Sequence, residues 1–549
     1  MIDFDLRHRE SCSSEALSET DAALSFLRWF GPDVMDSASL RDLERLIAQN
    51  PLAFFNPETG PEALEALYSS LSLPEGPMSM DEHVGHLQTH LLGHAMPTAA
   101  PSFIGHMTSA LPSYLPSLAK IMAALNQNQV KLETSRGFTP MERQVLGMLH
   151  QLIYGFDDAF YRPVLHSGEH ALGAFCSGGT TANITGLWAA RNNLLAADGD
   201  FTGVARAGLA AGLLHYGYAG LAILVSERGH YSLRKAADAL GIGQDNLVAV
   251  PTDSKDRIRL DALQASLERL RACKIKPLAI VGIAGTTETG AVDDLAALAN
   301  IAEQESCHYH IDAAWGGASL LSTRQRPIFK GIERADSVVI DAHKQLYAPM
   351  GAGLVFFKCP TLAAAISQHA NYIVRKDSKD LGRHTLEGSR SAMAMLLHAN
   401  LHILGRRGYE QLIDRSVDLT KFFAEAIRRQ DDFELISEPQ LCLLTYRYVP
   451  AVARQTLQRA DGDKRVRLQE ALDALTEDIQ ERQRAAGHSF VSRTRLTSTR
   501  WSPDSISVFR VVLANPLTNE DILLAVLQEQ RELALSSSQL ASLLALAQS

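Results

Sequence analysis

Three short stretches combine residue types that could carry chemistry at the ends of strands and helices. HIDAAWGG places Asp312 after an apolar run, and SVVIDAHKQLYAPMGAG places Lys344 after another. FCSGGTTANITGLWAAR places a Gly-Gly pair at the start of an expected helix. A buried aspartate needs a cationic partner, and a lysine at an apolar strand end can act as a Schiff-base nucleophile. A glycine-rich helix start offers free backbone N–H groups to a phosphate.

The glycine-rich stretch does not match the common nucleotide-binding loops. No Gly-Lys-Ser/Thr follows it, and it lacks G-x-G-x-x-G, which disfavours nucleoside triphosphates and dinucleotides as ligands. A phosphate site, a buried carboxylate and a reactive lysine, in this order along the chain, instead match the phosphate, the pyridine nitrogen and the aldehyde of pyridoxal 5′-phosphate (PLP). The pattern therefore predicts PLP as the cofactor.

The elements that must position these residues are those of an α/β protein. Between residues 101 and 420, apolar runs such as LAILVSE, LAIVGIAG and GAGLVFFK alternate with helical stretches. Such runs predict a mainly parallel central sheet that is covered by helices on both faces. Because ligands gather beyond the carboxyl ends of parallel strands, we expect the site at that edge.

Three segments are expected along the chain. Residues 1–100 read as an N-terminal helical segment with Pro/Gly punctuation, and residues 101–420 as a large PLP-binding domain. Residues 421–549 contain the strand-like runs LCLLTYRYV and SISVFRVVLA, with a charged helical stretch over 453–486 between them. They predict a small α+β C-terminal domain.

Composition narrows the partners and the compartment. The formal net charge of -10 and the lack of a basic block argue against a nucleic-acid partner. No signal peptide or bilayer-length apolar window is evident, so no membrane association is expected. The six cysteines show no C-x-x-C pairing, which favours free thiols and the cytoplasm.

No metal is expected either. A group of four histidines at helical spacings suggests a metal site at first sight, but no cysteine joins them and two glycines weaken the helix. Surface or interface histidines explain the spacing better. The four are His83, His86, His90 and His94.

The motifs D-A-H-K and H-I-D-A-A-W, with GGTTAN and GTTETGAVDD in order, resemble those of the group II PLP-dependent amino-acid decarboxylases. The resemblance covers roughly residues 100–530. It implies fold type I, the aspartate-aminotransferase-like fold, and a homodimer that builds shared active sites. It also implies an enzyme that removes the α-carboxylate of an amino acid.

The resemblance also assigns roles to single residues. Lys344 would carry the cofactor, Asp312 would keep its pyridine nitrogen protonated, and His230 would stack on its ring. Asp341 stands where relatives often have Asn. The remaining cofactor contacts within the chain would be Gly179, Thr180, Thr287, Ala314 and His343. Ser389, together with Gly388, would reach the cofactor phosphate of the neighbouring subunit.

For the substrate, FRVVLANPLTNEDI resembles the C-terminal stretch of glutamate decarboxylases and suggests that Arg510 binds a distal carboxylate. PSFIGHMTSALPSY lies where relatives line the substrate pocket, which points to His106 and Thr108. HMTSALPSYLPSLAKIMAALNQN and RHTLEGSRSAMAM most resemble bacterial PLP-dependent aspartate 1-decarboxylases, which make β-alanine. Glutamate decarboxylation is the close alternative, and another PLP reaction or an inactive PLP-fold scaffold are more distant ones.

The chain departs from the family in the loop after the lysine. Relatives carry a tyrosine there that delivers a proton to the substrate carbon, whereas the stretch after Tyr372 reads IVRKDSKDLGRHTLE. The best replacement as a proton donor in this stretch is His384.

Overall fold

The computed structural model describes residues 38–49, 59–369, 378–497 and 505–548, and the chain forms two compact units, 1–97 and 98–549. The described helices of the first unit are α2 (Ala38–Gln49), α3 (Pro61–Leu67) and α4 (Met80–His90). Helix α4 starts at a capping box in which the side chains of Ser79 and Glu82 satisfy each other's backbone N–H groups. Its His86 and His90 rings stack 4.1 Å apart. Across the described ranges, no three His, Cys, Asp or Glu side chains gather as metal ligands would.

The second unit is built on a seven-stranded sheet of order β1-β7-β6-β5-β4-β2-β3. The pairings from β3 to β6 are parallel, and β7 runs antiparallel to both of its neighbours. The mainly parallel sheet predicted from the sequence is therefore confirmed. The strands are β1 (Gly173–Cys176), β2 (Gly220–Ser226), β3 (Leu247–Val250), β4 (Ile275–Ile283), β5 (His308–Asp312), β6 (Ser337–Asp341) and β7 (Gly353–Phe357).

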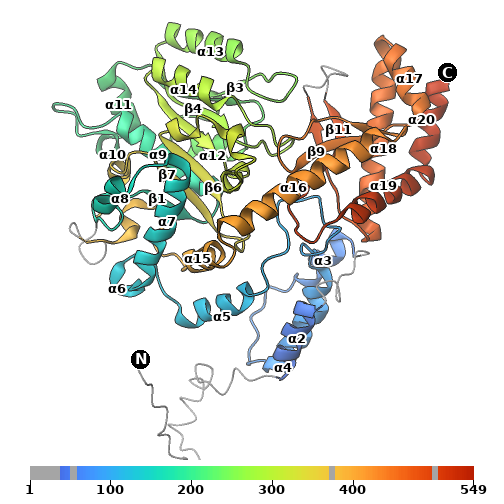
Figure 1. The fold of residues 1–549 in the computed structure, drawn as a ribbon, viewed down its shortest axis with the longest axis horizontal. Helices are drawn as coiled ribbons and strands as arrows, with labels where there is room; N and C mark the ends of the chain where they lie inside the picture. The colour runs from blue at the N-terminus through green and yellow to red at the C-terminus, as the bar shows by residue number, and fades with distance from the viewer. Residues whose placement is uncertain (1–37, 50–58, 370–377, 498–504, 549) are drawn as a thin grey trace, which may run out of the picture. The chain divides into compact units, whose positions relative to one another are not determined.

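Helices cover both faces of this sheet, as Figure 1 shows. Along β2, Leu224 points into the same apolar cluster as Leu263 and Leu298, while Ile223 packs with Leu187 on the opposite face. Because alternate side chains are buried on opposite faces, the strand reads as one continuous apolar run. The helices of this part are α5 (Leu115–Leu125), α6 (Leu132–Ser135), α7 (Phe138–Tyr154), α8 (Asp158–Val164), α9 (Gly179–Leu194), α10 (Val204–Ala207), α11 (Leu209–Tyr216), α12 (Ser232–Ala239), α13 (Leu260–Ala272), α14 (Leu295–Gln304) and α15 (Ala394–Ile403).

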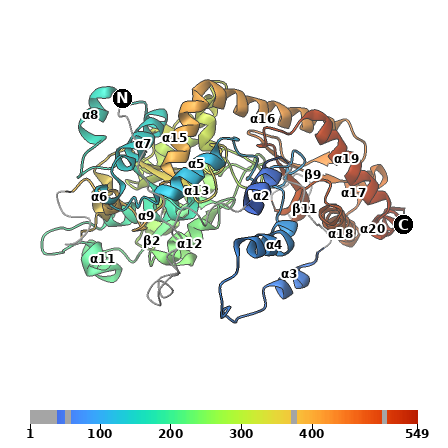
Figure 2. The same ribbon diagram turned by 90° about the horizontal axis from the view of Figure 1, so that it is seen from below.

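A second, antiparallel sheet of order β10-β11-β9-β8 follows in the chain and has its own apolar core. The long helix α16 (Gly405–Arg428) runs from the first sheet to the second, so the boundary expected at residue 420 falls inside a helix (Figure 1). Helices α17 to α20 gather at the end of this unit that lies away from α8 and α11 in both views (Figure 2). The elements are β8 (Phe433–Leu435), β9 (Leu443–Tyr448), α17 (Ala451–Arg459), α18 (Gly462–Ala486), β10 (Ser492–Leu496), β11 (Ile506–Val512), α19 (Glu520–Leu535) and α20 (Ser538–Gln548).

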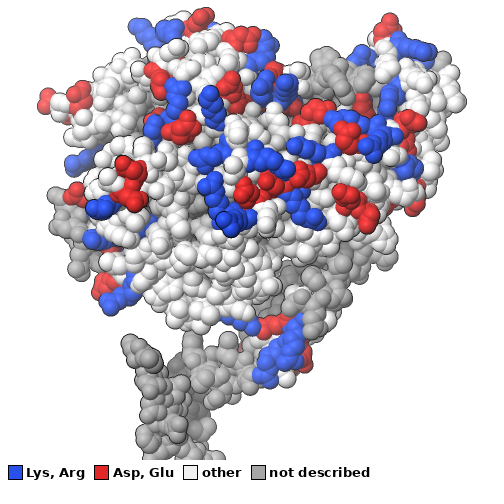
Figure 3. All heavy atoms as spheres, viewed as in Figure 1, with Lys and Arg blue, Asp and Glu red and all other residues white. Residues whose placement is uncertain are grey.

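Acidic and basic side chains are interspersed on the face drawn in Figure 3. Helix α16 contributes to this pattern, because its Asp414 and Asp418 both pair with Arg324. In the part of the chain that the structure describes, we find no helix with the length and apolar character required to cross a bilayer.

Buried histidines predict acid sensitivity of the fold. His150 on α7 is fully buried, with Nδ1 2.8 Å from the Tyr161 hydroxyl and Nε2 2.9 Å from the Phe357 carbonyl oxygen. Burial lowers the pKa of His150 from 6.5 to about 4, so the unfolded chain binds this proton more readily than the folded one. The stability that the neutral ring contributes is complete above pH 6.5 and is lost as the pH falls towards 4.

We therefore expect the free energy of unfolding to be about 2 kcal/mol lower at pH 5 than at pH 7 on account of this one ring. Urea titrations of the wild type and of His150→Gln, which cannot titrate, measure the difference. The gap between the two proteins should narrow at pH 5. An equal gap at both pH values would contradict the expectation.

Candidate active site

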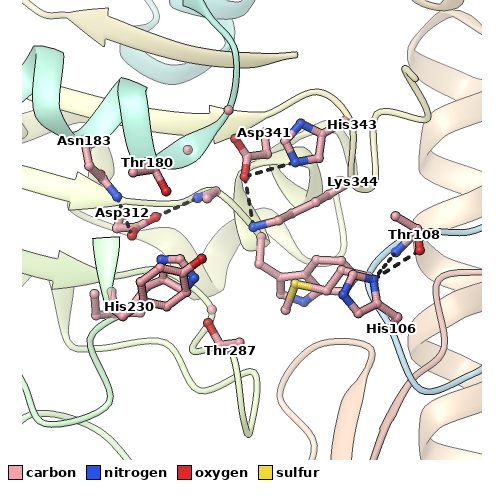
Figure 4. A pocket seen from close by; sticks show the side chains of 18 of the residues that line it. His106, Thr108, Thr180, Asn183, His230, Thr287, Asp312, Asp341, His343 and Lys344 are labelled. Carbon is pink, nitrogen blue, oxygen red and sulfur yellow. Dashed lines mark hydrogen bonds and ion pairs between the residues drawn. The ribbon is translucent and has the colours of Figure 1, made fainter. Parts of the chain in front are cut away.

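A cavity of about 520 Å³ lies beyond the carboxyl ends of the parallel strands (Figure 4). The loops after β2, β4, β5 and β6, the start of α9 and strand β11 all contribute to its wall. Twelve of the positions that the sequence singles out line this one cavity. They are His106, Thr108, Gly179, Thr180, His230, Thr287, Asp312, Ala314, Asp341, His343, Lys344 and Arg510.

The amine of Lys344 lies in the middle of the cavity (Figure 4). Lys344 follows the end of β6 by three residues, and its Nζ is 3.0 Å from Oδ2 of Asp341. The same oxygen is 3.6 Å from Nε2 of His343, and burial lowers the pKa of this histidine. Within the described residues, Oδ1 of Asp341 and Nδ1 of His343 are buried without a hydrogen-bond partner. This corner of the cavity therefore has unused hydrogen-bonding capacity.

Asp312 ends β5 and is 6% exposed. Its Oδ1 accepts a hydrogen bond from the backbone N–H of Ala314 at 3.1 Å, and its Oδ2 accepts one from Nδ2 of Asn183 at 3.0 Å. Both carboxylate oxygens are thus held by donors, which is how an ionised aspartate is accommodated inside a protein. A cationic ring nitrogen in the cavity would complete its environment.

The start of α9 provides an anion site. Gly178 precedes the helix, and none of the side chains that the structure describes caps its first turn, so the first backbone N–H groups are available to a ligand. A Cβ atom on Gly179 would lie 2.8 Å from Oδ2 of Asp341, so only glycine fits there without displacing that carboxylate. The close approach of α9 to the end of β6 brings the anion site next to Lys344.

Arg510 comes from the second sheet and closes the opposite side of the cavity. It is 8% exposed, and its Nε donates to the Thr287 carbonyl oxygen at 2.7 Å. Its Nη1 lies 3.3 Å from the Gly105 carbonyl oxygen. Burial lowers the pKa of Arg510 to about 10, with a smaller opposing effect of Glu288, so the group is cationic at neutral pH. Among the residues that the structure describes, no carboxylate lies within ion-pair distance of it.

Two histidines lie on either side of the lysine amine (Figure 4). Nδ1 of His230 is 2.8 Å from the Ser232 hydroxyl, and burial lowers the pKa of His230. Nδ1 of His106 is 3.1 Å from the Thr108 hydroxyl. Burial, followed by the charges of Arg510 and Lys344, lowers the pKa of His106 as well. Both rings are therefore neutral near pH 7, and each can donate through only one nitrogen.

Three positions singled out in the sequence, His384, Gly388 and Ser389, lie outside the cavity of their own chain. His384 is 2% exposed, and its Nδ1 is 3.1 Å from the Ala363 carbonyl oxygen. The Ser389 hydroxyl instead accepts a hydrogen bond from Nδ2 of Asn128 at 3.0 Å. Neither side chain lines the cavity that holds Lys344.

Sequence reasoning missed several cavity residues. Asn183 holds Asp312 and lies one helical turn after Gly179, a spacing that could have indicated it. Tyr231 and Met350 line the mouth and are 62% and 63% exposed. Arg228 also lines the wall, where it pairs with Asp256 at 2.9 Å. No signal in the sequence separates these three from ordinary surface or core residues.

The residues present fit PLP. The backbone N–H groups at the start of α9 suit the phosphate of PLP, and the Lys344 amine suits its aldehyde. Asp312, held by two hydrogen bonds, suits the pyridine nitrogen. The two unpaired buried atoms of Asp341 and His343 lie beside the anion site, where a ligand can use them. Fold and cavity together define a PLP-dependent enzyme of fold type I.

Comparison with known proteins identifies the family. The conserved domain of pyridoxal-dependent decarboxylases matches residues 61–449, and the chain belongs to this family. It is 56% identical over 518 residues to an aspartate 1-decarboxylase of Aliivibrio fischeri, covering 93% of this chain and 95% of that protein. It is 29% identical to an L-2,4-diaminobutyrate decarboxylase of Rhizobium meliloti, covering 76% and 79%. The crystal structure of mouse CSAD superposes with a TM-score of 0.79 at 25% identity, covering 92% and 99%. The chain is therefore a PLP-dependent amino-acid decarboxylase.

Proposed function

We propose that the enzyme removes the α-carboxylate of L-aspartate and yields β-alanine and CO₂. The observation that carries the proposal is Arg510, a buried cation that faces the cavity and has no carboxylate partner among the described residues. Glu288 offsets part of the Arg510 charge from beyond ion-pair distance, and a ligand carboxylate in the cavity would supply a direct partner for the buried guanidinium. The side-chain carboxylate of an acidic amino acid supplies it, and the 56% identity to an aspartate 1-decarboxylase supports the shorter of the two acidic substrates.

The residues that line the cavity have separate roles in holding the cofactor and in binding the substrate. When bound, PLP supplies an aldehyde for the amino group of the substrate and a ring that takes up the electrons of the broken bond. Lys344 provides the amine that holds the cofactor, and Asp312 holds a proton at the ring nitrogen. Arg510 fixes the distal carboxylate, so the α-carboxylate is the one left free to depart. His106 and Thr108 complete the substrate side of the wall.

Glutamate is the second candidate, because the same arginine could bind a side chain that is one methylene longer. Parallel assays of CO₂ release from aspartate, glutamate, cysteine sulfinate and 2,4-diaminobutyrate separate the candidates. We expect the highest kcat/KM for aspartate. A preference for the diamino acid would show that Arg510 does not select the substrate, because a second ammonium group cannot pair with a guanidinium.

We propose that the enzyme works as a homodimer with shared active sites. Helix α5 supports this, since its sequence LPSLAKIMAAL is almost entirely apolar, yet Ile121 and Leu125 are 49% and 50% exposed in the single chain. Apolar surface of this kind is typical of a face that a partner covers. A second copy is the occupant that the family resemblance implies. Light scattering should give twice the mass of the chain, and an active monomer would contradict the proposal.

We further propose that His384 delivers the proton to the substrate carbon, and that Ser389 contacts the cofactor phosphate, each in the cavity of the partner subunit. Neither side chain lines the cavity of its own chain, so neither can act there. Because the His384 ring is also buried in its own chain against Ala363, its role in proton delivery requires both the second copy and a rearrangement of the segment 381–384 that exposes the ring.

Subunit mixing tests this arrangement. Lys344→Ala and His384→Gln are each expected to be nearly inactive alone. A mixture of the two that has exchanged subunits should regain activity, because one site of each hybrid dimer then contains both wild-type residues. Activity of a hybrid no higher than that of the two parents would contradict the shared site.

We propose the cytoplasm as the place of action. Cys176, Cys273, Cys307, Cys359 and Cys442 are all free thiols in the structure, which suits a reducing compartment. Fractionation of cells that produce the protein tests this assignment.

A further inference from the structure

A branched set of buried hydrogen bonds begins at Asp312. The amide nitrogen of Asn183 donates to Oδ2 of Asp312 and to the hydroxyl oxygen of Ser232, both at 3.0 Å. The amide oxygen of Asn183 lies 2.9 Å from Nε2 of His310. Asn183, Ser232 and His310 are at most 1% exposed. Of these three, Asn183 lines the cavity and His310 lies behind it.

The hydrogen bonds continue from His310 to the amino ends of β5 and β6. Nδ1 of His310 is 2.7 Å from the hydroxyl of Ser337, the first residue of β6. The same hydroxyl is 2.7 Å from Nε2 of His308, which starts β5 two residues before His310. Nδ1 of His308 is 3.8 Å from Oδ2 of Asp336, whose side chain is 49% exposed. A path of hydrogen bonds therefore connects the cavity wall to His308, whereas the contact between His308 and Asp336 is too long for a hydrogen bond.

Each hydrogen bond in this path has one possible direction. A carboxylate only accepts, so Asn183 must turn its NH₂ group to Asp312 and its oxygen to His310. Nε2 of His310 then carries the proton, and Nδ1 accepts from the Ser337 hydroxyl. Burial lowers the pKa of His310, in keeping with a neutral ring. If the Asn183 amide were reversed, its oxygen would face the Asp312 carboxylate, and two acceptors would meet.

A second branch reaches His230. The Ser232 hydroxyl accepts from Asn183, so its own hydrogen is free to point to Nδ1 of His230 at 2.8 Å. The backbone N–H of Ser232 points to the same nitrogen at 3.2 Å. Nδ1 therefore accepts, and the proton of the neutral ring stays on Nε2. One amide thus ties together the carboxylate and the imidazole that face the cofactor.

Gly186 on α9 shows that the fold makes room for the His310 ring. A Cβ atom at this position would lie 2.9 Å from Cε1 of His310. Glycine inside a helix is less favourable than alanine, yet here it lets the ring sit against the helix. The position of the ring is therefore set by packing as well as by hydrogen bonds.

We propose that Asn183 and His310 are positioning residues for the reaction: they hold the Asp312 carboxylate against the ring nitrogen of PLP and fix the hydrogen-bonding state of His230. The proposal rests on the PLP-dependent function above and deepens it. His310 acts through Asn183, without touching the cofactor. Its removal frees the Asn183 amide to rotate, which weakens the hold on Asp312 while leaving the cavity wall intact.

The test compares His310→Leu with His310→Gln. Glutamine can place an amide N–H near the position of Nε2, whereas leucine cannot donate. The ¹⁵N chemical shift of the ring nitrogen in labelled PLP, bound to each protein without substrate, reports its protonation. We expect the shift to move towards that of an unprotonated ring in the leucine variant and to stay near the wild-type value in the glutamine variant. The dissociation constant of PLP should rise about tenfold in His310→Leu, which quenching of the tryptophan fluorescence, including that of Trp315 in the cavity wall, measures.

His150→Leu is the matched control. His150 is as buried as His310, and both of its ring nitrogens have hydrogen-bond partners, but none of these partners leads to Asp312. The control should lose thermal stability without moving the ¹⁵N shift. Ser337→Ala is a second variant that keeps the test open if His310→Leu does not fold, and it should move the shift in the same direction by less. A wild-type shift and affinity in His310→Leu, or an equal change in the control, would overturn the proposal. Both readouts are taken without substrate, so they do not depend on which amino acid is decarboxylated.

Discussion

Replacement of Lys344 by alanine is expected to lower the rate of CO₂ release by about a thousandfold or more. Lys344 Nζ lies at the centre of the cavity, 3.0 Å from Asp341, and it provides the amine that joins the cofactor to the protein. Without this amine, PLP is held by its phosphate and ring contacts alone. The visible absorption of PLP bound to the protein as a Schiff base should disappear, which a spectrum after incubation with PLP measures directly.

Lys276→Ala is the control for this change. Lys276 lies at the amino end of β4, away from the carboxyl ends of the strands that form the cavity. Its Nζ donates to the carbonyl oxygen of Glu305. This variant should keep both the absorption band and the activity. If Lys344→Ala retained the wild-type band and rate, another residue would carry the cofactor, and the assignment of the site would be wrong.

Replacement of Arg510 by methionine should lower kcat/KM for aspartate by about a hundredfold to a thousandfold. Methionine fills similar space but leaves the distal carboxylate of the substrate in a buried site without a partner. The loss should appear mainly in KM, because the arginine binds a part of the substrate that does not react. Affinity for PLP should change little, since Arg510 bonds to the backbone carbonyl oxygens of Thr287 and Gly105 and its replacement leaves the Thr287 side chain in place.

Two further variants calibrate this result. Arg510→Lys keeps the charge but loses the planar pair of donors, and it should lie between the wild type and the methionine variant. Arg495→Met removes another arginine of the same sheet, one that pairs with Asp473 instead of facing the cavity, and it should leave kcat/KM unchanged. An Arg510→Met enzyme that still prefers aspartate as strongly as the wild type would show that another group binds the distal carboxylate.

The sheet could be predicted from the sequence because its strands are buried on both faces. GLAILVS in β2 and SVVID in β6 are continuous apolar runs. The candidate site residues His230 and Lys344 come a few positions after the ends of these runs. The limits of helices were harder to predict. The stretch over 453–486 is two helices, α17 and α18, which meet at Asp461 and Gly462, a turn-forming pair whose glycine has a φ of +47°. Helix α16 crosses the boundary expected at residue 420 because its apolar face packs on both sheets.

Most of the site was predictable for a different reason: Asp312 ends β5 and Lys344 follows the end of the neighbouring strand β6, so the topology of the sheet brings them together. The hydrogen bonds behind Asp312 were not predictable. Asn183 and His310 are 127 positions apart in the chain, and nothing in the periodicity of either segment names the other as its partner. His384 illustrates the converse, since a residue type suited to proton transfer lies buried against Ala363, outside the cavity of its own chain.

The most direct measurement is the fate of the two carboxylates of aspartate. The purified enzyme, loaded with PLP, is given L-aspartate labelled with ¹³C at C1, and the products are followed by NMR. We expect the label to leave as CO₂ and bicarbonate while unlabelled β-alanine accumulates in equal amount. Label retained in alanine would mean that the distal carboxylate departs, and formation of oxaloacetate would mean transamination. Either result would contradict a cavity in which Arg510 holds the distal carboxylate and leaves the α-carboxylate free.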